Sequence, residues 1–211
     1  MATRRSFLLA GLTLVACAYA APLRAAAEVV PPVLQTPMLF IAALGDQTLA
    51  VIRGNAPTQQ KMAYFHLLLQ QDFDIPGVAP SVLGPYWRVA TDGERQEFVQ
   101  LLESYILVTF GRRLADYGGQ TLRVTGSRGT QSDPIVISEI SRPGAAPLRL
   151  EWVLTTRKGV YQISDVIVDG VSMITTQRSE FASIIARTGG TIAGLLVKMR
   201  QIIAEAACSR A

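Results

Sequence analysis

The sequence has few of the residues from which metal sites and nucleophilic active sites are built. It contains one histidine, His66, and two cysteines, Cys17 and Cys208. Because structural zinc sites need four nitrogen or sulfur ligands, this supply excludes a zinc site of that kind. There is also no D-x-D-x-D loop, no G-x-S-x-G, no Walker loop and no G-x-G-x-x-G after a strand. We therefore predict no metal, no cofactor, no catalytic residue and no intramolecular disulfide.

Charge is also scarce, because charged residues make up 17% of the chain and hydrophobic ones 49%. The formal net charge of +4 comes largely from residues 1–27, which hold three arginines and no acidic residue. The rest of the chain has 17 basic and 16 acidic side chains. This balance excludes the electrostatic attraction that nucleic-acid binding requires, and the apolar content argues against disorder.

Residues 1–27 have the pattern of an export signal. The twin arginines Arg4 and Arg5 precede an apolar run over 7–16. That run is too short to span a bilayer, which needs about 20 residues. Residues 25–27 (AAA) offer a cleavage site, and the alternative is a lipoprotein signal in which Cys17 is acylated. The pattern predicts a twin-arginine signal peptide over 1–27, a periplasmic location and a single domain over 28–211.

Hydrophobic spacing predicts helices first and strands afterwards. Apolar residues recur every three or four positions over 37–53, 58–72, 80–89 and from a cap at Thr91 to about 117. Residues 74–77 (DIPG) predict a turn. Alternation predicts strands over 121–131, 134–142, 147–157 and 161–168. A helix capped by Thr175 or Thr176 and a last helix over 191–207 follow. This order predicts an α+β fold with an antiparallel sheet of about four strands.

The stretch over 161–190 carries the most specific pattern. A β-branched strand ends at Asp169-Gly170 and leads into an apolar junction and a helix. Twelve positions follow in order the signature of a known family: Tyr161, Ile163, Asp165, Val166, Gly170, Val171, Ser172, Ser179, Phe181, Ile184, Arg187 and Gly189. On these residues the sequence resembles the MlaC-type (toluene-tolerance) family of periplasmic phospholipid-binding proteins, the substrate-binding components of ABC lipid transport systems.

The resemblance implies a twisted antiparallel sheet with helices packed on it, enclosing an apolar lipid cavity. It implies a carrier, not an enzyme, that shuttles phospholipid between the outer and inner membranes and maintains outer-membrane lipid asymmetry. The implied partners are an outer-membrane lipoprotein–porin complex and an inner-membrane MCE-domain ABC transporter, with the carrier itself a monomer. The expected tail contacts are Phe65, Leu68, Tyr105, Ile106, Leu150, Trp152, Val166, Val168, Val171, Met173, Ile174, Phe181 and Ile185.

Several alternatives stay open. The strand through Val166 is apolar on both faces, so Ile163 and Ile167 are the alternative tail contacts on it. The ligand is alternatively a hopanoid or another polycyclic lipid. An isomerase or hydrolase would instead use Asp165 in the cavity; the structural interpretation pairs Asp165 with an arginine or a backbone donor. Arg178 and Arg187 are expected beside a carboxylate, or beside a lipid phosphate at the cavity mouth.

Overall fold

The computed structural model describes residues 36–115, 119–157 and 159–208. The elements are α1 (Pro37–Arg53), α2 (Thr58–Asp72), α3 (Ile75–Leu83), α4 (Tyr86–Val89), α5 (Asp92–Ala115), β1 (Thr121–Gly129), β2 (Pro134–Arg142), β3 (Ala145–Arg157), β4 (Val160–Val168), β5 (Val171–Ser172), α6 (Met173–Arg187) and α7 (Ile192–Cys208). The predicted signal peptide over 1–27 lies outside the described residues.

Capping groups fix the ends of several helices. At the start of α1 the Thr36 hydroxyl accepts a hydrogen bond from the Leu39 backbone N–H. The predicted cap at Thr91 is confirmed, because the Thr91 N–H donates to the Glu94 carboxylate at 2.9 Å and the Glu94 N–H donates back to the Thr91 hydroxyl at 3.2 Å. The predicted helices over 37–53 and 58–72 are confirmed at those bounds.

The predicted turn over 74–77 is wrong, because these residues begin α3. The Asp74 carboxylate accepts a hydrogen bond from the Gly77 N–H at 3.0 Å, and Pro76 lies in the first turn, where a proline costs no helical hydrogen bond. The predicted helix over 80–89 is correspondingly two helices. They are separated at Gly84, whose φ of 61° favours glycine.

The predicted start of α6 is also wrong. Ser172, rather than Thr175 or Thr176, caps the helix, since its hydroxyl accepts a hydrogen bond from the Thr175 N–H at 3.1 Å. The helix therefore begins at Met173. Its first turn includes the apolar junction that follows β5.

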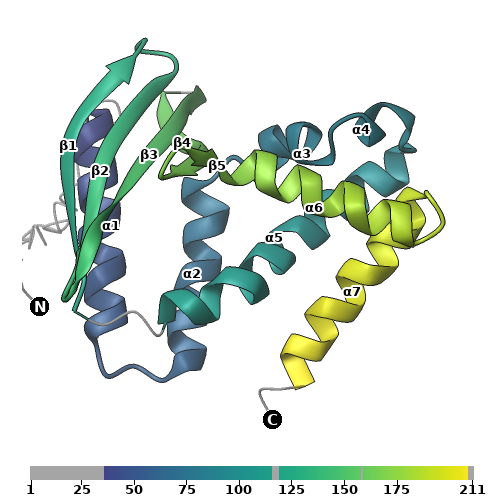
Figure 1. The fold of residues 1–211 in the computed structure, drawn as a ribbon, viewed down its shortest axis with the longest axis horizontal. Coiled ribbons are helices and arrows are strands. Elements are labelled where there is room, and N and C mark those ends of the chain that lie inside the picture. The colour runs from purple at the N-terminus through teal and green to yellow at the C-terminus, as the bar shows by residue number, and fades with distance from the viewer. Residues whose placement is uncertain (1–35, 116–118, 158, 209–211) are drawn as a thin grey trace, which may run out of the picture. The chain divides into compact units, whose positions relative to one another are not determined.

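The strands form an antiparallel meander in the order β1-β2-β3-β4-β5 (Figure 1). This confirms the predicted fold class and sheet, to which β5 adds two residues. In β3, Leu150 and Leu154 are buried on the inner face, while Arg149 is exposed on the outer face. Glu151, also on the outer face, accepts hydrogen bonds from Arg128 and Arg149. The bond from Arg128 is the main cause that holds the pKa of the Glu151 carboxyl group below its usual value, and the bond from Arg149 adds to it.

Ser164 is an extra residue in β4, and it reverses the alternation of that strand. Two consecutive residues of β3, Val153 and Leu154, pair with Asp165 and Ile163. Ser164 therefore has no residue opposite it on β3. Because of this bulge, Ile163 before it and Val166 and Val168 after it lie on the same, inner face of the sheet.

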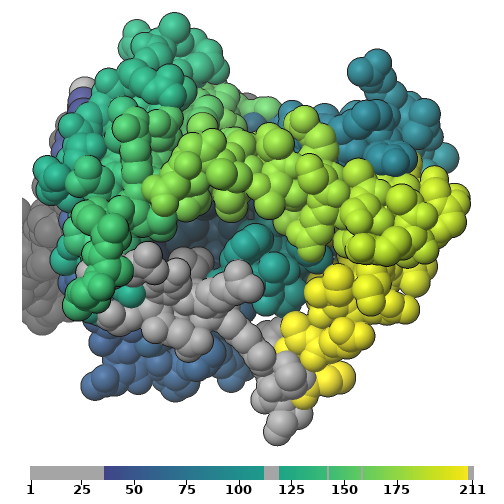
Figure 2. Space-filling model, viewed as in Figure 1, coloured from purple at the N-terminus to yellow at the C-terminus, as the bar shows by residue number. Residues whose placement is uncertain are grey.

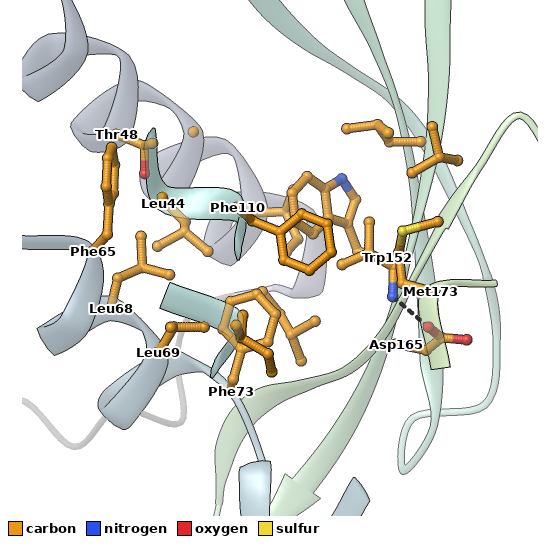
Figure 3. Close-up of a pocket in the computed structure, with 18 of the residues that line it drawn as sticks. Leu44, Thr48, Phe65, Leu68, Leu69, Phe73, Phe110, Trp152, Asp165 and Met173 are labelled. Atoms are coloured by element: carbon orange, nitrogen blue, oxygen red, sulfur yellow. Dashed lines mark hydrogen bonds between the residues drawn. The ribbon is translucent and has the colours of Figure 1, made fainter. Parts of the chain in front are cut away.

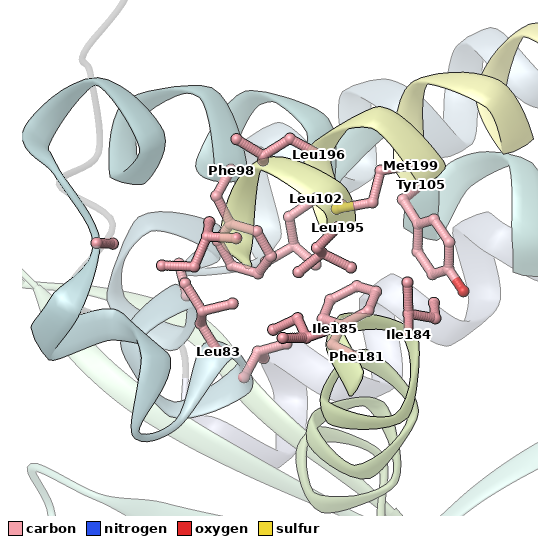
Figure 4. Close-up of a cluster of buried hydrophobic side chains, with 14 of the residues drawn as sticks. Leu83, Phe98, Leu102, Tyr105, Phe181, Ile184, Ile185, Leu195, Leu196 and Met199 are labelled. Carbon is pink, nitrogen blue, oxygen red and sulfur yellow. The ribbon is translucent and has the colours of Figure 1, made fainter. Parts of the chain in front are cut away.

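Buried side chains gather in two main clusters. The helical core forms where α3, α5, α6 and α7 meet, and Phe181 lies at its centre with its ring edge-on to Phe98 and Tyr105 (Figure 4). The sheet core joins α1 to the inner face of β2, β3 and β4: Ile41, Leu44, Val136, Leu154 and Ile163. A smaller cluster ties the end of α1 to α2. The described hydrophobic interior is therefore divided rather than continuous.

In the described part of the chain, no single helix is long and apolar enough to cross a membrane. α6 and α7 reach that length and composition only as a pair, and the chain bends by 109° between them. Both helices contribute buried residues to the helical core.

Candidate functional site

A cavity of about 600 Å³ lies between the inner face of the sheet and the helices. Figure 3 shows Leu68, Leu69 and Phe73 on one side of it and Trp152 and Met173 on the opposite side. In the space-filling view a recess opens beneath α6, with atoms of α5 inside it (Figure 2). The volume is within the range of about 300–1,000 Å³ that is typical of small-molecule sites.

The lining comes from five helices, four strands and two residues that lie outside them, Phe73 and Gln120. The lining residues are Ile41, Leu44, Gly45, Thr48, Leu49 and Ile52 of α1; Phe65, Leu68 and Leu69 of α2; Phe73; Ile75, Val78 and Val82 of α3; Leu102, Ile106, Leu107, Phe110 and Gly111 of α5; Gln120, Thr121 and Leu122; Ile140 of β2; Leu148, Leu150 and Trp152 of β3; Ile163, Ser164, Asp165, Val166 and Val168 of β4; and Met173, Ile174 and Gln177 of α6. Nearly all are apolar, so the wall suits hydrocarbon rather than a polar metabolite.

The cavity has a deep end and a rim. Away from the rim, the most buried lining residues, each at most 4% exposed, are Ile41, Ile75, Val82, Leu102 and Ile163. At the rim Thr121 is exposed, and Gln120 and Leu148 are partly exposed. Leu148 lies six positions before Leu154, which pairs with Ile163 at the deep end. At about 3.3 Å per strand residue, the distance from rim to deep end is roughly 20 Å.

Asp165 is the one charged residue in the described lining, and its carboxylate is already hydrogen-bonded. It accepts from the Val166 N–H at 2.8 Å, the Ile174 N–H at 3.1 Å and the Ser172 hydroxyl at 2.5 Å. The dashed line in Figure 3 marks a hydrogen bond to it. These contacts tie the end of β4 to the start of α6 and confirm the backbone donors expected from the sequence. They also engage the hydroxyl of Ser172, the residue that caps α6.

A second polar group of the wall, Gln177, is also engaged. Its amide donates to the Glu180 carboxylate at 3.1 Å, and the Tyr105 hydroxyl donates to the same carboxylate at 2.9 Å. Burial, followed by the hydrogen bond to Glu180, raises the pKa of Tyr105 to about 12. These groups connect α5 to α6.

The rim beside the end of α1 differs from the wall around Asp165 and Gln177, because one of its buried polar atoms has no hydrogen-bond partner in the described structure. The side-chain oxygen Oε1 of Gln120 is buried and has no hydrogen-bond partner among the described residues. Arg53 donates to the backbone carbonyl of Gln120, and Lys61 donates to the backbone carbonyl of Ile52 at 2.6 Å. This corner therefore carries two cations and one unsatisfied amide oxygen.

No group of three or more histidine, cysteine, aspartate or glutamate side chains that could hold a metal ion lies among residues 36–115, 119–157 and 159–208.

The family model described as "MlaC protein" matches residues 43–201. The chain belongs to the MlaC family. This confirms the resemblance seen in the sequence, on a match that extends across α1 to α7 rather than over the 161–190 stretch alone.

Two proteins show how far the likeness to this MlaC-family chain extends. It is 22% identical over 176 residues to the intermembrane phospholipid transport system binding protein MlaC of Haemophilus influenzae, covering 79% of this chain and 81% of that one. Its fold matches a phospholipid-binding protein from Ralstonia solanacearum, solved in complex with a phospholipid, with a TM-score of 0.66 at 22% identity. That match covers 81% of this chain and 97% of the other.

Nine of the thirteen residues expected from the sequence to contact acyl tails line the cavity of the MlaC-family fold. They are Phe65, Leu68, Ile106, Leu150, Trp152, Val166, Val168, Met173 and Ile174. Of the two alternative tail contacts on β4, Ile163 lines the cavity and Ile167 does not. The bulge at Ser164 explains why residues of both proposed faces meet there.

The other four expected residues lie elsewhere. Tyr105, Phe181 and Ile185 are in the helical core, at most 2% exposed, and Val171 in the β4–β5 hairpin is 56% exposed. The reason is that only the first turns of α6 reach the cavity, while its later turns face α3, α5 and α7. Tyr105 similarly turns from the cavity toward α6, although its neighbour Ile106 lines the wall.

The arginines expected at the cavity mouth also lie elsewhere. Arg178 donates to the backbone carbonyl of Ser81 at 2.6 Å, and Arg187 is exposed in the last turn of α6. Neither lines the cavity.

Sequence reasoning missed the wall that α1 contributes. Ile41, Leu44, Thr48 and Ile52 follow one another at spacings of three and four, so they share one helix face. That signal was visible, but an apolar helix face indicates burial without indicating whether protein or ligand covers it.

Proposed function

We propose that this protein binds a phospholipid by enclosing its acyl chains in the cavity and carries it between the two membranes of a cell envelope. The observation that carries the proposal is the apolar cavity of about 600 Å³ between the inner face of the sheet and the helices. Membership of the MlaC family supports it. So do the transport role in the name of the Haemophilus relative and the phospholipid in the Ralstonia structure.

The depth of the cavity suits an acyl chain. The distance from the rim to the deep end is roughly 20 Å, calculated from the rise per residue of a strand. Each leaflet of a bilayer contributes about half of a hydrocarbon core of about 30 Å, so an acyl chain in a membrane spans about 15 Å. A chain inserted from the rim would therefore reach the deep end while its head group stays near the surface.

The energy for binding would come from the hydrocarbon. Burying a methylene group is worth about 0.8 kcal/mol, so a chain of about 15 methylenes gives on the order of 12 kcal/mol before the costs of association. The head group can stay in contact with water, so its phosphate need not be desolvated. Binding by partition requires no catalytic group, in keeping with the satisfied carboxylate of Asp165.

The family and the sequence of residues 1–27 support a setting for this activity in the cell envelope. The carrier would be exported to the periplasm by its twin-arginine signal and act as a monomer, or be tethered through Cys17 if the signal is that of a lipoprotein. It would exchange lipid with an outer-membrane lipoprotein–porin complex and an inner-membrane MCE-domain ABC transporter, and thereby maintain outer-membrane lipid asymmetry.

The test is to purify the protein from a native periplasm without detergent and to identify its ligand by native mass spectrometry and lipid extraction. We expect one phospholipid per protein. Protein that carries no lipid, and takes up none from vesicles, would contradict the proposal. A hopanoid or another polycyclic lipid as the only ligand would replace the phospholipid assignment with the polycyclic alternative.

A further inference from the structure

The polar groups of the cavity wall are unevenly satisfied, and this bears on the direction in which a lipid enters. On one side the Asp165 carboxylate receives three hydrogen bonds. At the rim beside α1, Gln120 Oε1 is buried without a partner in the described structure. A buried amide oxygen left unpaired costs about 1–3 kcal/mol, so a ligand or water that supplies a donor there is favoured.

The same corner holds positive charge that no described carboxylate neutralises. The Arg53 guanidinium has five N–H donors and uses one of its nitrogens for the Gln120 carbonyl. The Lys61 ammonium contacts the Ile52 carbonyl. Neither cation forms a salt bridge with a described acidic residue, whereas Arg123, Arg128, Arg149, Arg157 and Arg200 all do.

The opposite side of the cavity carries negative charge. Asp165 lies across the pocket from Thr48 and Phe65 in Figure 3, and Glu180 follows Gln177 of the wall by one turn of α6. A phosphodiester would be repelled at the side of Asp165 and attracted at the side of Arg53.

We infer that Arg53 and Gln120 form the head-group site at this rim, so that the phosphate lies beside Arg53 when the acyl chain is directed toward Ile163. This inference rests on the proposed function. Arg53 is the contact for the phosphate oxygens. The side-chain oxygen of Gln120 accepts a hydrogen bond from a donor of the head group, such as a hydroxyl of phosphatidylglycerol, and thereby gains a partner. The deep end, around Ile163 and Leu102, receives the methyl end of the chain.

The test compares two lipids that differ only in the phosphate head group. Equilibrium extraction from vesicles is measured with dioleoyl phosphatidylglycerol and with dioleoylglycerol, for the wild-type protein and for Arg53→Gln, Arg53→Lys and Gln120→Leu. We expect Arg53→Gln to weaken phosphatidylglycerol binding about tenfold and dioleoylglycerol binding less than twofold. Arg53→Lys should recover most of the loss, because it restores the charge.

Arg178→Gln is the matched control. Arg178 also donates to a distant backbone carbonyl, that of Ser81 on α3, and it does not line the cavity, so its replacement should leave the preference between the two lipids unchanged. Gln120→Leu should lower the preference for phosphatidylglycerol and stabilise the delipidated protein, since it removes the unsatisfied oxygen.

The outcomes separate this inference from the proposed function. If the wild-type protein extracts neither lipid, the proposed function itself fails. If it extracts both and Arg53→Gln weakens both equally, Arg53 only holds the start of β1 and the head-group site is wrong. Glycerol 3-phosphate should not displace the bound lipid; displacement at micromolar concentration would make the corner a site for free phosphate esters and overturn the inference.

Discussion

Replacing Leu68 by tryptophan is expected to weaken lipid binding strongly while sparing the fold. Leu68 projects from α2 into the cavity (Figure 3), and the adjacent Leu67 on the same helix is 53% exposed. Making the same substitution at both positions separates the effect of filling the cavity from any effect of tryptophan on α2.

The size of the effect follows from the volume that tryptophan takes. Tryptophan has about six more non-hydrogen atoms than leucine, so in a cavity of about 600 Å³ it displaces up to about six methylene groups of the ligand. At about 0.8 kcal/mol each, the upper limit is a loss of about 5 kcal/mol. The chain can slide toward the rim and the wall can repack, so we expect about half of that, or roughly 70-fold in Kd.

The assay is equilibrium transfer of a fluorescent phospholipid from vesicles, with thermal unfolding of the delipidated proteins as the second measurement. Leu68→Trp should raise Kd about 70-fold and Leu67→Trp less than twofold. Because a filled cavity leaves less empty space, delipidated Leu68→Trp should unfold at the same temperature as the wild type or higher. Equal lipid affinity of the two variants, with native far-ultraviolet spectra, would refute the assignment of this cavity as the lipid site.

Three further predictions concern the groups that shape the cavity. Trp152→Phe removes the indole N–H that donates to the fully buried Ser138 hydroxyl at 2.9 Å. It should cost about 1–3 kcal/mol in urea unfolding, and adding Ser138→Ala should recover part of the loss; no recovery would show that the hydrogen bond is unimportant. Asp165→Asn should lower the free energy of unfolding by about 1–3 kcal/mol while bound lipid per folded molecule stays constant, whereas lost lipid at unchanged stability would indicate a direct role for the carboxylate. Tyr105 has a folded pKa of about 12, above its usual value of 10, so its stabilising effect is complete below pH 10 and is lost as the pH rises toward 12. The stability difference between the wild type and Tyr105→Phe should therefore shrink over that interval, and a constant difference would contradict the shift.

The helices and strands followed from the sequence because their signals are local. Thr91 and Glu94 cap α5 with groups three residues apart. The alternation through Leu148, Leu150 and Trp152 requires only that one face of β3 be buried. The errors at α3 and α6 were also local, since Asp74 and Ser172 were competing capping residues that the sequence contained.

The lining of the cavity was harder to predict because an apolar side chain has the same character whether a lipid or another side chain covers it. Phe181 and Met173 lie on one helix and are both apolar, yet Phe181 belongs to the helical core and Met173 to the wall. What separates them is that the axis of α6 starts at the sheet edge and leaves the cavity after about two turns. Asp165 of β4 helps to fix that direction, because its carboxylate accepts from the Ile174 N–H in the first turn of the helix and from the hydroxyl of the capping Ser172.

The bulge in β4 shows how one residue can decide the composition of the whole wall. A regular strand would place Ile163 and Ile167 on one face and Val166 and Val168 on the other, and one pair would be lost to the cavity. Ser164, left unpaired between Ile163 and Asp165, shifts the alternation by one, so the strand lines the deep end with Ile163 and the region near the rim with Val166 and Val168. The same shift turns Asp165 toward the start of α6, where it holds the helix that closes the cavity. Deleting Ser164 would therefore be expected to impair the wall and the helix attachment together, a coupling that separate substitutions at Val166 or Asp165 would not reproduce.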